Sequence, residues 1–242
     1  MAPAECATAA PDARQWFQLY WSSDREFTRE LLASVAAAGF SALVVTVDLP
    51  VLGNRERDMR TNFPFPPPAP LPNVSPWLQP LGRGAGHVVD ASLSWRDLEW
   101  LREQCSLPLV LKGILTAADA QLAVEHGAAA VVVSNHGGRQ LDGVPASLDA
   151  LPEVIEAVGD RVEVLLDGGV RRGTDVLVAL ALGARAVLVG RPVVWGLAVN
   201  GQDGVRRVLE VLRAEVELGL ALLGCCSPAD VQAGHVQRAG SR

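Results

Sequence analysis

The chain has 242 residues, of which 49% are apolar and 20% are charged, with a formal net charge of -6 at pH 7. These values argue against global disorder, and the length suits one α/β barrel or up to two smaller domains. The acidic balance argues against nucleic acid as the main partner, because neutralising phosphates requires a basic surface.

A repeated pattern predicts the fold class. Three segments, residues 36–47, 124–133 and 180–189, each read as a helix end, a glycine, a short link and a β-branched run. Glycine suits the C-terminus of a helix, and valine-rich runs without alternation are typical of strands buried on both faces of a parallel sheet. The repeat therefore predicts a parallel α/β architecture.

In chain order, six segments are predicted strands: residues 16–20, 42–47, 109–112, 130–134, 162–166 and 186–189. Helices are predicted between most of them, with starts near Ser92, Thr116 and Arg172 and a final helix over 204–223. Residues 61–91 differ, because eight prolines and a glycine-rich run exclude helix and strand there. We expect a mobile loop over the functional site, although an insertion without a role fits the composition equally well.

Polar residues end or directly follow every predicted strand. In strand order they are Gln18 and Tyr20, Thr46 and Asp48, Lys112, Ser134 to Arg139, Asp167 to Gly169, and Gly190 with Arg191. Because the carboxyl ends of parallel barrel strands open onto one face, we expect these side chains to share one active site.

The last two strand ends indicate a phosphate site. Residues 167–174 (DGGVRRGT) and 190–192 (GRP) each lead from a strand into a helix. Glycines let backbone N–H groups approach an anion, a helix start adds partial positive charge, and the final two loops of a barrel commonly seat phosphate. Two tight turns with solvated arginines are the alternative.

The loop after the fourth strand, SNHGGRQLD at 134–142, indicates acid–base chemistry on a carboxylate substrate. Arg139 can grip a carboxylate through two parallel hydrogen bonds, and His136 can accept a proton near neutral pH. Asp48 is a possible orienting partner for His136. A core or turn histidine is the alternative. By the same test, His87 and His126 are interpreted as structural or surface residues.

Lys112 ends an otherwise apolar strand and therefore needs a negative partner. An electron-rich flavin ring meets this need, because a cation near its N1 stabilises the reduced anion. A structural ion pair and a Schiff-base lysine remain as alternatives.

The cysteines and the chain ends indicate neither a metal site nor a membrane protein. Cys6, Cys105, Cys225 and Cys226 form no CxxC pair and no metal-ligand spacing with histidine. The N-terminus lacks the features of a secretory signal, and the last three residues do not match the small-basic-leucine peroxisomal signal. We expect a reduced, cytoplasmic protein without metal or membrane span.

Seven segments match a known family: FQLY at 17–20, TVD at 46–48, LGNRERD at 52–58, LVLKGI at 109–114, VSNHGGRQLDG at 133–143, LDGGVRRGTDV at 166–176 and LVGRP at 188–192. Together they resemble the FMN-dependent 2-hydroxy acid oxidases and dehydrogenases. The resemblance implies a single (β/α)₈ barrel domain over 1–242 and FMN as cofactor. It also implies oxidation of a small L-2-hydroxy acid, such as glycolate or lactate, to the 2-oxo acid. The electrons would pass to O₂, giving hydrogen peroxide, or to another acceptor.

By matched position, the resemblance implies that the flavin ring is contacted by Gln18, Thr46, Lys112 and Ser134. The ribityl chain and phosphate would be held by Asp167, Gly168, Gly169, Arg171, Gly190 and Arg191. His136 would be the catalytic base with Asp48 as its partner, and the substrate would be bound by Tyr20, Arg55 and Arg139. Family members often form tetramers and some are peroxisomal, so the resemblance also allows a homo-oligomer and that compartment.

The match leaves one part of the fold without a counterpart. Six strands are predicted where the family barrel has eight, and the first two are the ones missing, so we expect an incomplete barrel with exposed edges. One interpretation is an oxidase whose opening segment lies outside this sequence. The other is a non-catalytic remnant or subunit with weak or no FMN binding. Another phosphate-binding barrel, such as an aldolase, is disfavoured by the arrangement of His136 and Arg139.

Overall fold

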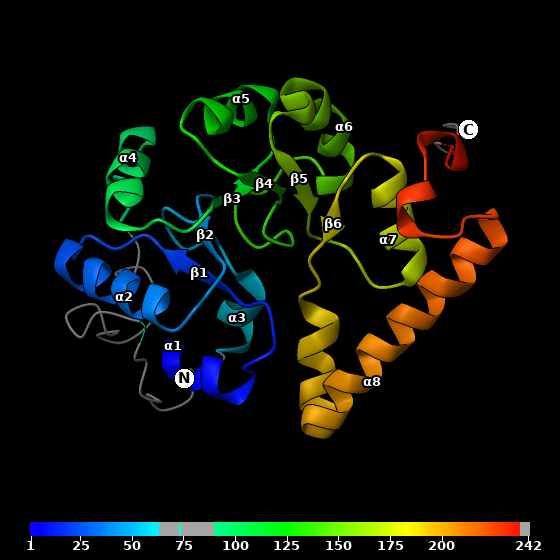
Figure 1. Ribbon diagram of the computed structural model, residues 1–242, viewed down its shortest axis with the longest axis horizontal. Coiled ribbons are helices and arrows are strands. Elements are labelled where there is room, and N and C mark those ends of the chain that lie inside the picture. The colour runs from blue at the N-terminus through cyan, green and yellow to red at the C-terminus, as the bar shows by residue number, and fades with distance from the viewer. Residues whose placement is uncertain (63–72, 74–89, 238–242) are drawn as a thin grey trace.

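A computed structural model of the chain describes residues 1–62, 73 and 90–237 (Figure 1). Within these residues, six strands form one sheet whose order follows the chain from β1 to β6, and every neighbouring pair is parallel. The strands are β1 Trp16–Tyr20, β2 Ala42–Thr46, β3 Leu109–Ile114, β4 Ala130–Val133, β5 Glu163–Leu166 and β6 Ala186–Val187. The predicted α/β class and all six predicted strands are confirmed, and the arrangement is that of six of the eight units of a (β/α)₈ barrel.

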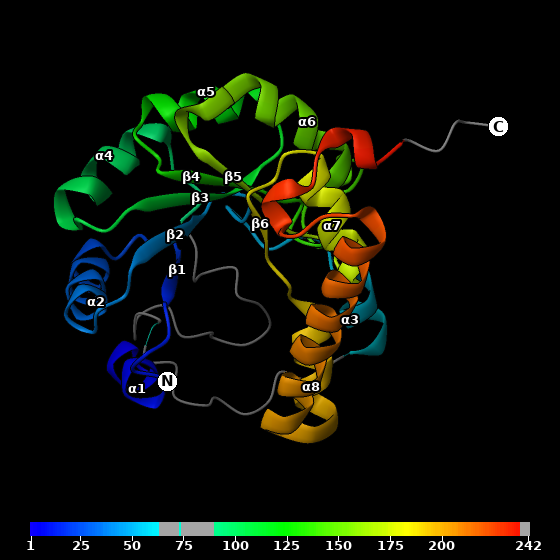
Figure 2. The same ribbon diagram turned by 45° about the vertical axis from the view of Figure 1, so that its right-hand side comes forward.

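Helices follow the strands along the chain. They are α1 Pro3–Ala9, α2 Arg25–Ala37, α3 Glu56–Thr61, α4 Trp95–Gln104, α5 Ala117–Glu125, α6 Ser147–Val158, α7 Gly173–Ala181 and α8 Arg191–Leu223, with short 3-10 turns at Gly159–Arg161, Pro228–Asp230 and Ala233–His235. Helices α2, α4, α5, α6 and α7 lie along the outer side of the strand arc in both Figure 1 and Figure 2. This arrangement leaves the inner side of the arc to the strand side chains and the loops.

The helix starts follow capping signals in the sequence. Asp24 accepts a hydrogen bond from the Phe27 N–H at 3.0 Å at the start of α2, and Thr116 accepts one from the Asp119 N–H at 3.1 Å at the start of α5. These bonds satisfy N–H groups that have no partner inside a helix. The helix starts predicted near Ser92, Thr116 and Arg172 are confirmed, since α4, α5 and α7 begin at Trp95, Ala117 and Gly173.

The alternation of side chains along each strand divides the core into two clusters and places the polar groups. Outward residues of the strands, including Leu43, Leu111 and Val131, pack with the helices in the larger cluster. A smaller cluster on the inner side contains Ala42, Val44, Val110, Ala130, Val132 and Leu165. Because side chains alternate with a period of two, the next inward positions fall on Thr46, Lys112, Ser134 and Asp167. The apolar inner cluster therefore gives way to polar side chains at the carboxyl ends of the strands.

Helix α8 is longer than the helix predicted over 204–223 and is broken in the middle. Asn200 and Gly201 have non-helical backbone angles, with φ of -150° and 55°. The two parts meet closely, since a side-chain carbon added at Gly204 would lie 1.9 Å from the carbonyl oxygen of Gly196. Such an approach depends on long-range packing, which the local sequence pattern does not encode.

Two expectations concern residues that the structure mostly does not describe. Of the loop predicted at 61–91, Thr61 is the last residue of α3, and the expectation of a mobile cover lies largely outside the described residues, as does His87.

In the part of the chain that the structure describes, no helix is both long and apolar enough to cross a membrane.

Candidate active site

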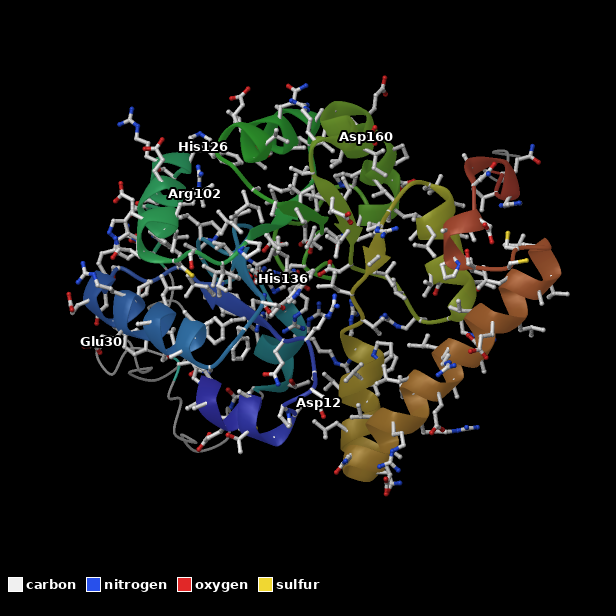
Figure 3. The ribbon with its side chains drawn as sticks, in the orientation of Figure 1. Asp12, Glu30, Arg102, His126, His136 and Asp160 are labelled. Carbon is white, nitrogen blue, oxygen red and sulfur yellow. The ribbon has the colours of Figure 1, made fainter. Side chains whose placement is uncertain are left out.

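The predicted site residues converge on one cavity of about 330 Å³ at the carboxyl ends of the strands. Eleven of the fifteen line it directly: Gln18, Tyr20, Lys112, His136, Arg139, Asp167, Gly168, Gly169, Arg171, Gly190 and Arg191. Figure 3 shows His136 near the middle of the molecule, whereas Arg102, His126 and Asp160 lie at its outer side. The expectation of a single shared site is thus met for these residues.

The other predicted residues stand behind this lining. The Gln18 amide donates a hydrogen bond to the Thr46 hydroxyl at 2.7 Å, and Lys112 donates one to the Ser134 hydroxyl at 3.0 Å. Asp48 bonds to His136. Arg55 precedes α3, and its charge acts on the phenol of Tyr20. Thr46, Ser134 and Asp48 are therefore linked to the cavity by hydrogen bonds to side chains that line it, and Arg55 acts on one such side chain through its charge.

His136 and Asp48 form a hydrogen-bonded pair. The Nδ1 atom of His136 lies 2.9 Å from Oδ1 of Asp48, and the two side chains are 16% and 13% exposed. A carboxylate at this distance places the proton of a neutral imidazole on Nδ1, which leaves Nε2 as the proton acceptor. The pair therefore has the geometry of an oriented general base.

The position of Asp48 depends on Gly113, which the sequence analysis did not single out. Gly113 has φ of 115°, and a side-chain carbon added there would lie 2.6 Å from Cβ of Asp48. The register between β3 and β4 shifts at this residue, between Lys112 and Ile114. A glycine inside an otherwise largely apolar strand is the signal that could have indicated this close approach.

The backbone of the histidine loop is left-handed at His136, with φ of 56°, a conformation uncommon outside glycine. Its N–H donates to the Ser134 hydroxyl at 3.1 Å, and the Gly138 N–H donates to the carbonyl of Asn135 at 3.0 Å. The Asn135 N–H donates to the hydroxyl of Ser147 at 3.1 Å. These bonds hold an unfavourable backbone conformation, as is typical of functional sites.

Lys112 makes the ion pair that the sequence left open as an alternative. Its Nζ lies 3.0 Å from Oδ2 of Asp167, and the side chains are 10% and 15% exposed. The second carboxylate oxygen of Asp167 is buried and has no hydrogen-bond partner among the described residues. Because Lys112 also lines the cavity, the ion pair and a role toward a bound ligand are compatible.

The two glycine-rich loops differ in what they offer an anion. At the start of α7, Asp175 accepts from the N–H groups of Arg171 and Arg172 at 2.8 and 2.9 Å, and Glu215 accepts from Gly173 at 2.7 Å. These three N–H groups therefore already have acceptors within the chain, while Gly168, Gly169 and Arg171 of the same loop line the cavity. Gly190 and Arg191 at the start of α8 line it as well, and the phosphate site formed by the two loops stays a prediction.

Arg171 and Arg191 of these loops have partners that the sequence did not indicate. The guanidinium of Arg171 lies 5.0 Å from the ring centre of Trp195 in α8, a cation–π distance. Arg191 donates to the carbonyl of Gly137 at 2.7 Å, which links the start of α8 to the histidine loop. His126 stacks on Trp95 with ring centres 5.6 Å apart, which agrees with its expected structural role.

Tyr20 gives the site a pH-dependent signal. Burial raises the pKa of its phenol above the ordinary value of 10.0, the Asp48 carboxylate raises it further, and Arg55 lowers it. Tyr20 is the only tyrosine of the chain, so the ultraviolet absorbance of tyrosinate reports this group alone. We expect a titration midpoint above 10 in the folded protein and a lower midpoint after denaturation.

Because the pKa of the Tyr20 phenol is raised in the folded protein, the free energy of unfolding depends on pH. The contribution of Tyr20 to the free energy of unfolding is fully present below pH 10 and is lost as the pH rises through the folded pKa. Asp48→Asn is expected to lower the folded midpoint, and Arg55→Gln is expected to raise it. Equal midpoints in the folded and denatured protein would contradict this assignment.

Comparison with known proteins agrees with this geometry. The chain is 52% identical over 238 residues to L-lactate oxidase of Nostoc sp. and 52% identical over 234 residues to 2-hydroxyacid oxidase 1 of Homo sapiens, covering 94% and 91% of this chain. A solved structure of mandelate oxidase with 3,3-difluoro-2-hydroxy-3-phenylpropionic acid has a TM-score of 0.83 at 45% identity and covers 96% of this chain. The chain spans 65%, 63% and 65% of these three proteins, which is less than two thirds of each.

A family model adds a match over nearly the whole sequence. The model describes the FMN-dependent dehydrogenases and matches residues 1–238. The region matched contains every strand of the sheet and every residue of the cavity. This chain therefore belongs to the family of FMN-dependent dehydrogenases.

Proposed function

We propose that the cavity binds FMN and that the protein oxidises a small L-2-hydroxy acid to the 2-oxo acid, with O₂ as the electron acceptor and hydrogen peroxide as the second product. The single observation that carries this proposal is the His136–Asp48 pair, which shares a cavity with Arg139, Lys112 and Arg191. The relatives whose names are L-lactate oxidase and 2-hydroxyacid oxidase 1 support the same substrate class.

The residues of the cavity fit FMN. Side-chain carbons added at Gly169 or Gly190 would meet no atom within 4 Å, so the backbone there faces open space that a ligand can fill. Arg171 and Arg191 supply positive charge for a phosphate, and the carboxylate of Asp167, a residue that lines the cavity, can accept a hydrogen bond from a ribityl hydroxyl. When bound, FMN supplies the acceptor for the two electrons that leave the substrate.

The cofactor contacts divide into two groups. We assign Gln18, Thr46, Lys112 and Ser134 to the flavin ring, and Asp167, Gly168, Gly169, Arg171, Gly190 and Arg191 to the ribityl chain and phosphate. The side chains of the first group face the inner side of the sheet near the carboxyl ends of β1 to β4. Hydrogen bonds join Gln18 to Thr46 and Lys112 to Ser134. The second group follows β5 and β6.

The substrate is held and activated by a separate set of side chains. Arg139 is exposed in the cavity and grips the carboxylate. Tyr20, which lines the cavity, and Arg55, whose charge acts on Tyr20, bind near the hydroxyl. Nε2 of His136 accepts a proton from the substrate. Asp48 holds the imidazole in position and stabilises the imidazolium that results.

We also propose that identical chains associate and that the protein acts in the cytoplasm. Association is supported by exposed apolar side chains of α8, since Val194, Trp195, Leu197 and Val199 are 59%, 53%, 56% and 85% exposed. The location is supported by the four cysteines, which are free thiols, as is usual in a reducing compartment.

The proposal is tested by reconstituting the purified chain with FMN. We expect flavin absorbance to remain with the protein after gel filtration, and peroxide to form from glycolate or L-lactate but not from D-lactate. Longer L-2-hydroxy acids then define the chain-length preference. Arg139→Met is the matched variant, expected to retain FMN and to lose apparent affinity for the acid. A chain that binds no FMN at saturating concentration and forms no peroxide would contradict the proposal.

A further inference from the structure

We propose that Gln140 is a positioning residue that fixes the loop carrying Asp48 and Arg55 against the loop carrying His136 and Arg139. The inference rests on the proposed function, because it concerns the geometry of that same site. Gln140 does not line the cavity. It acts through the neighbouring backbone, and the contacts of its amide group define that action.

The side-chain amide of Gln140 makes three hydrogen bonds to one segment. Its Nε2 donates to the backbone carbonyls of Asp48 at 3.0 Å and Val51 at 2.9 Å. Its Oε1 accepts from the N–H of Gly53 at 3.2 Å. One side chain therefore satisfies three backbone groups of a segment that lies about ninety residues away in the sequence.

The same two loops touch through their backbones at Gly53. A side-chain carbon added at Gly53 would lie 2.4 Å from the carbonyl oxygen of Arg139 and 2.7 Å from Cα of Gln140. No side chain fits into this space, so the loops are held together at backbone distance. The amide of Gln140 fixes their register at this contact.

The consequence for the site follows from what each loop carries. Asp48 accepts a hydrogen bond from Gln140 on its backbone and bonds through its carboxylate to His136 at 2.9 Å. Arg139 directly precedes Gln140, and Arg55 follows Gly53 by two residues. Gln140 therefore sets the position of the base relative to the groups that bind the acid. A misplacement of about 1 Å in such an arrangement costs on the order of 100-fold in rate.

The chemistry of the contact requires an amide. Two of its partners are carbonyl oxygens, which need N–H donors, and the third is an N–H group, which needs an acceptor. Glutamate at position 140 keeps the acceptor but places a carboxylate oxygen against two carbonyls. Methionine has a similar length and neither donates nor accepts strongly. These two substitutions separate the loss of the bonds from an added repulsion.

Gln15 provides a matched control. Its Nε2 also donates to two backbone carbonyls, those of Cys6 at 3.1 Å and Ala10 at 3.0 Å, but it lies outside the site. Gln15→Met is thus the same chemical change at a place without catalytic groups. It is expected to leave both the loops of the site and the turnover number as they are in the parent protein.

The first measurement is hydrogen–deuterium exchange, which does not depend on activity. In Gln140→Met, the backbone amides of residues 51–55 are expected to exchange about tenfold faster, most directly at Gly53, with a similar thermal midpoint. Unchanged exchange at Gly53 would overturn the proposed clamp. Should Gln140→Met fail to fold, Gln140→Asn, which keeps the amide on a shorter stem, is measured in the same way and is expected to show the same acceleration.

The second measurement is steady-state oxidation by the FMN-loaded protein. Gln140→Met is expected to lower kcat by roughly 10-fold with unchanged flavin content, and Gln140→Glu is expected to lower it at least as far. Faster exchange combined with parental kcat would overturn the positioning role. If the parent itself oxidises no 2-hydroxy acid, the proposed function fails, while the exchange data still decide whether Gln140 joins the two loops.

Discussion

His136→Asn is expected to lower the turnover number of the FMN-loaded protein by a factor on the order of 10² to 10⁴, because it removes the group that we propose to accept the substrate proton. Asparagine is the appropriate substitution, since His136 has φ of 56° and asparagine adopts this left-handed conformation more readily than most residues. Its amide can still bond to Asp48. The substitution therefore removes basicity while it keeps the loop in place.

The measurement is peroxide formation from L-lactate, together with flavin absorbance and binding of the 2-oxo acid product. Flavin content and product binding are expected to stay close to the parent values, because Arg139 and the cofactor contacts are unchanged. His126→Asn is the control, since His126 stacks on Trp95 outside the cavity. Turnover in His136→Asn within a few-fold of the parent would exclude His136 as the base.

Much of the fold and of the cavity could be predicted from the sequence because both follow local rules. Valine-rich runs after glycine specify buried parallel strands, and the strand ends of such a sheet meet at one face. Polar residues placed directly after those runs therefore share a site. Eleven of the fifteen predicted residues line one cavity for this reason.

The features that the sequence did not indicate all depend on contacts between distant segments. The approach of Gly113 to Asp48 and the link from Arg191 to Gly137 require the loops to be in place already. The N–H of Gly173 at the start of α7 donates to the carboxylate of Glu215 in α8, and no local sequence pattern indicates this contact. Gln140 belongs to the SNHGGRQLD segment, but the local sequence does not show that its side chain contacts the distant segment containing Gly53.

Lys112→Met is expected to lower the free energy of unfolding of the FMN-free protein by about 2–4 kcal/mol. The reason is that the Asp167 carboxylate, 15% exposed, loses the cation 3.0 Å from its Oδ2. Its other oxygen already has no hydrogen-bond partner among the described residues. A buried charge without a partner destabilises the folded state by more than the ion pair stabilises it. The single substitution is therefore expected to lower the free energy of unfolding further than removal of both charges does. Urea denaturation followed by circular dichroism measures the change.

Arg185→Met is the matched control for this loss. The Arg185–Glu163 pair is 3.4 Å apart, and its side chains are 70% and 58% exposed. Solvent screens such a pair, so its removal is expected to cost less than about 1 kcal/mol. A cost for Lys112→Met no larger than this would mean that the Asp167 carboxylate is solvated and that burial does not govern the pair.

The double variant Lys112→Met/Asp167→Asn separates the structural role of Lys112 from the role toward FMN that we propose for it. Neutralising Asp167 removes the unpaired charge, so most of the lost stability is expected to return. FMN affinity is not expected to return, because the cation proposed to lie beside the flavin ring is gone and a neutral amide oxygen is a weaker acceptor for a ribityl hydroxyl than a carboxylate. Stability must be measured without FMN, since a ligand that binds only the folded state adds to the free energy of unfolding. If stability and FMN affinity recovered together, Lys112 would serve the fold alone, and the charge beside the flavin would have to come from another residue.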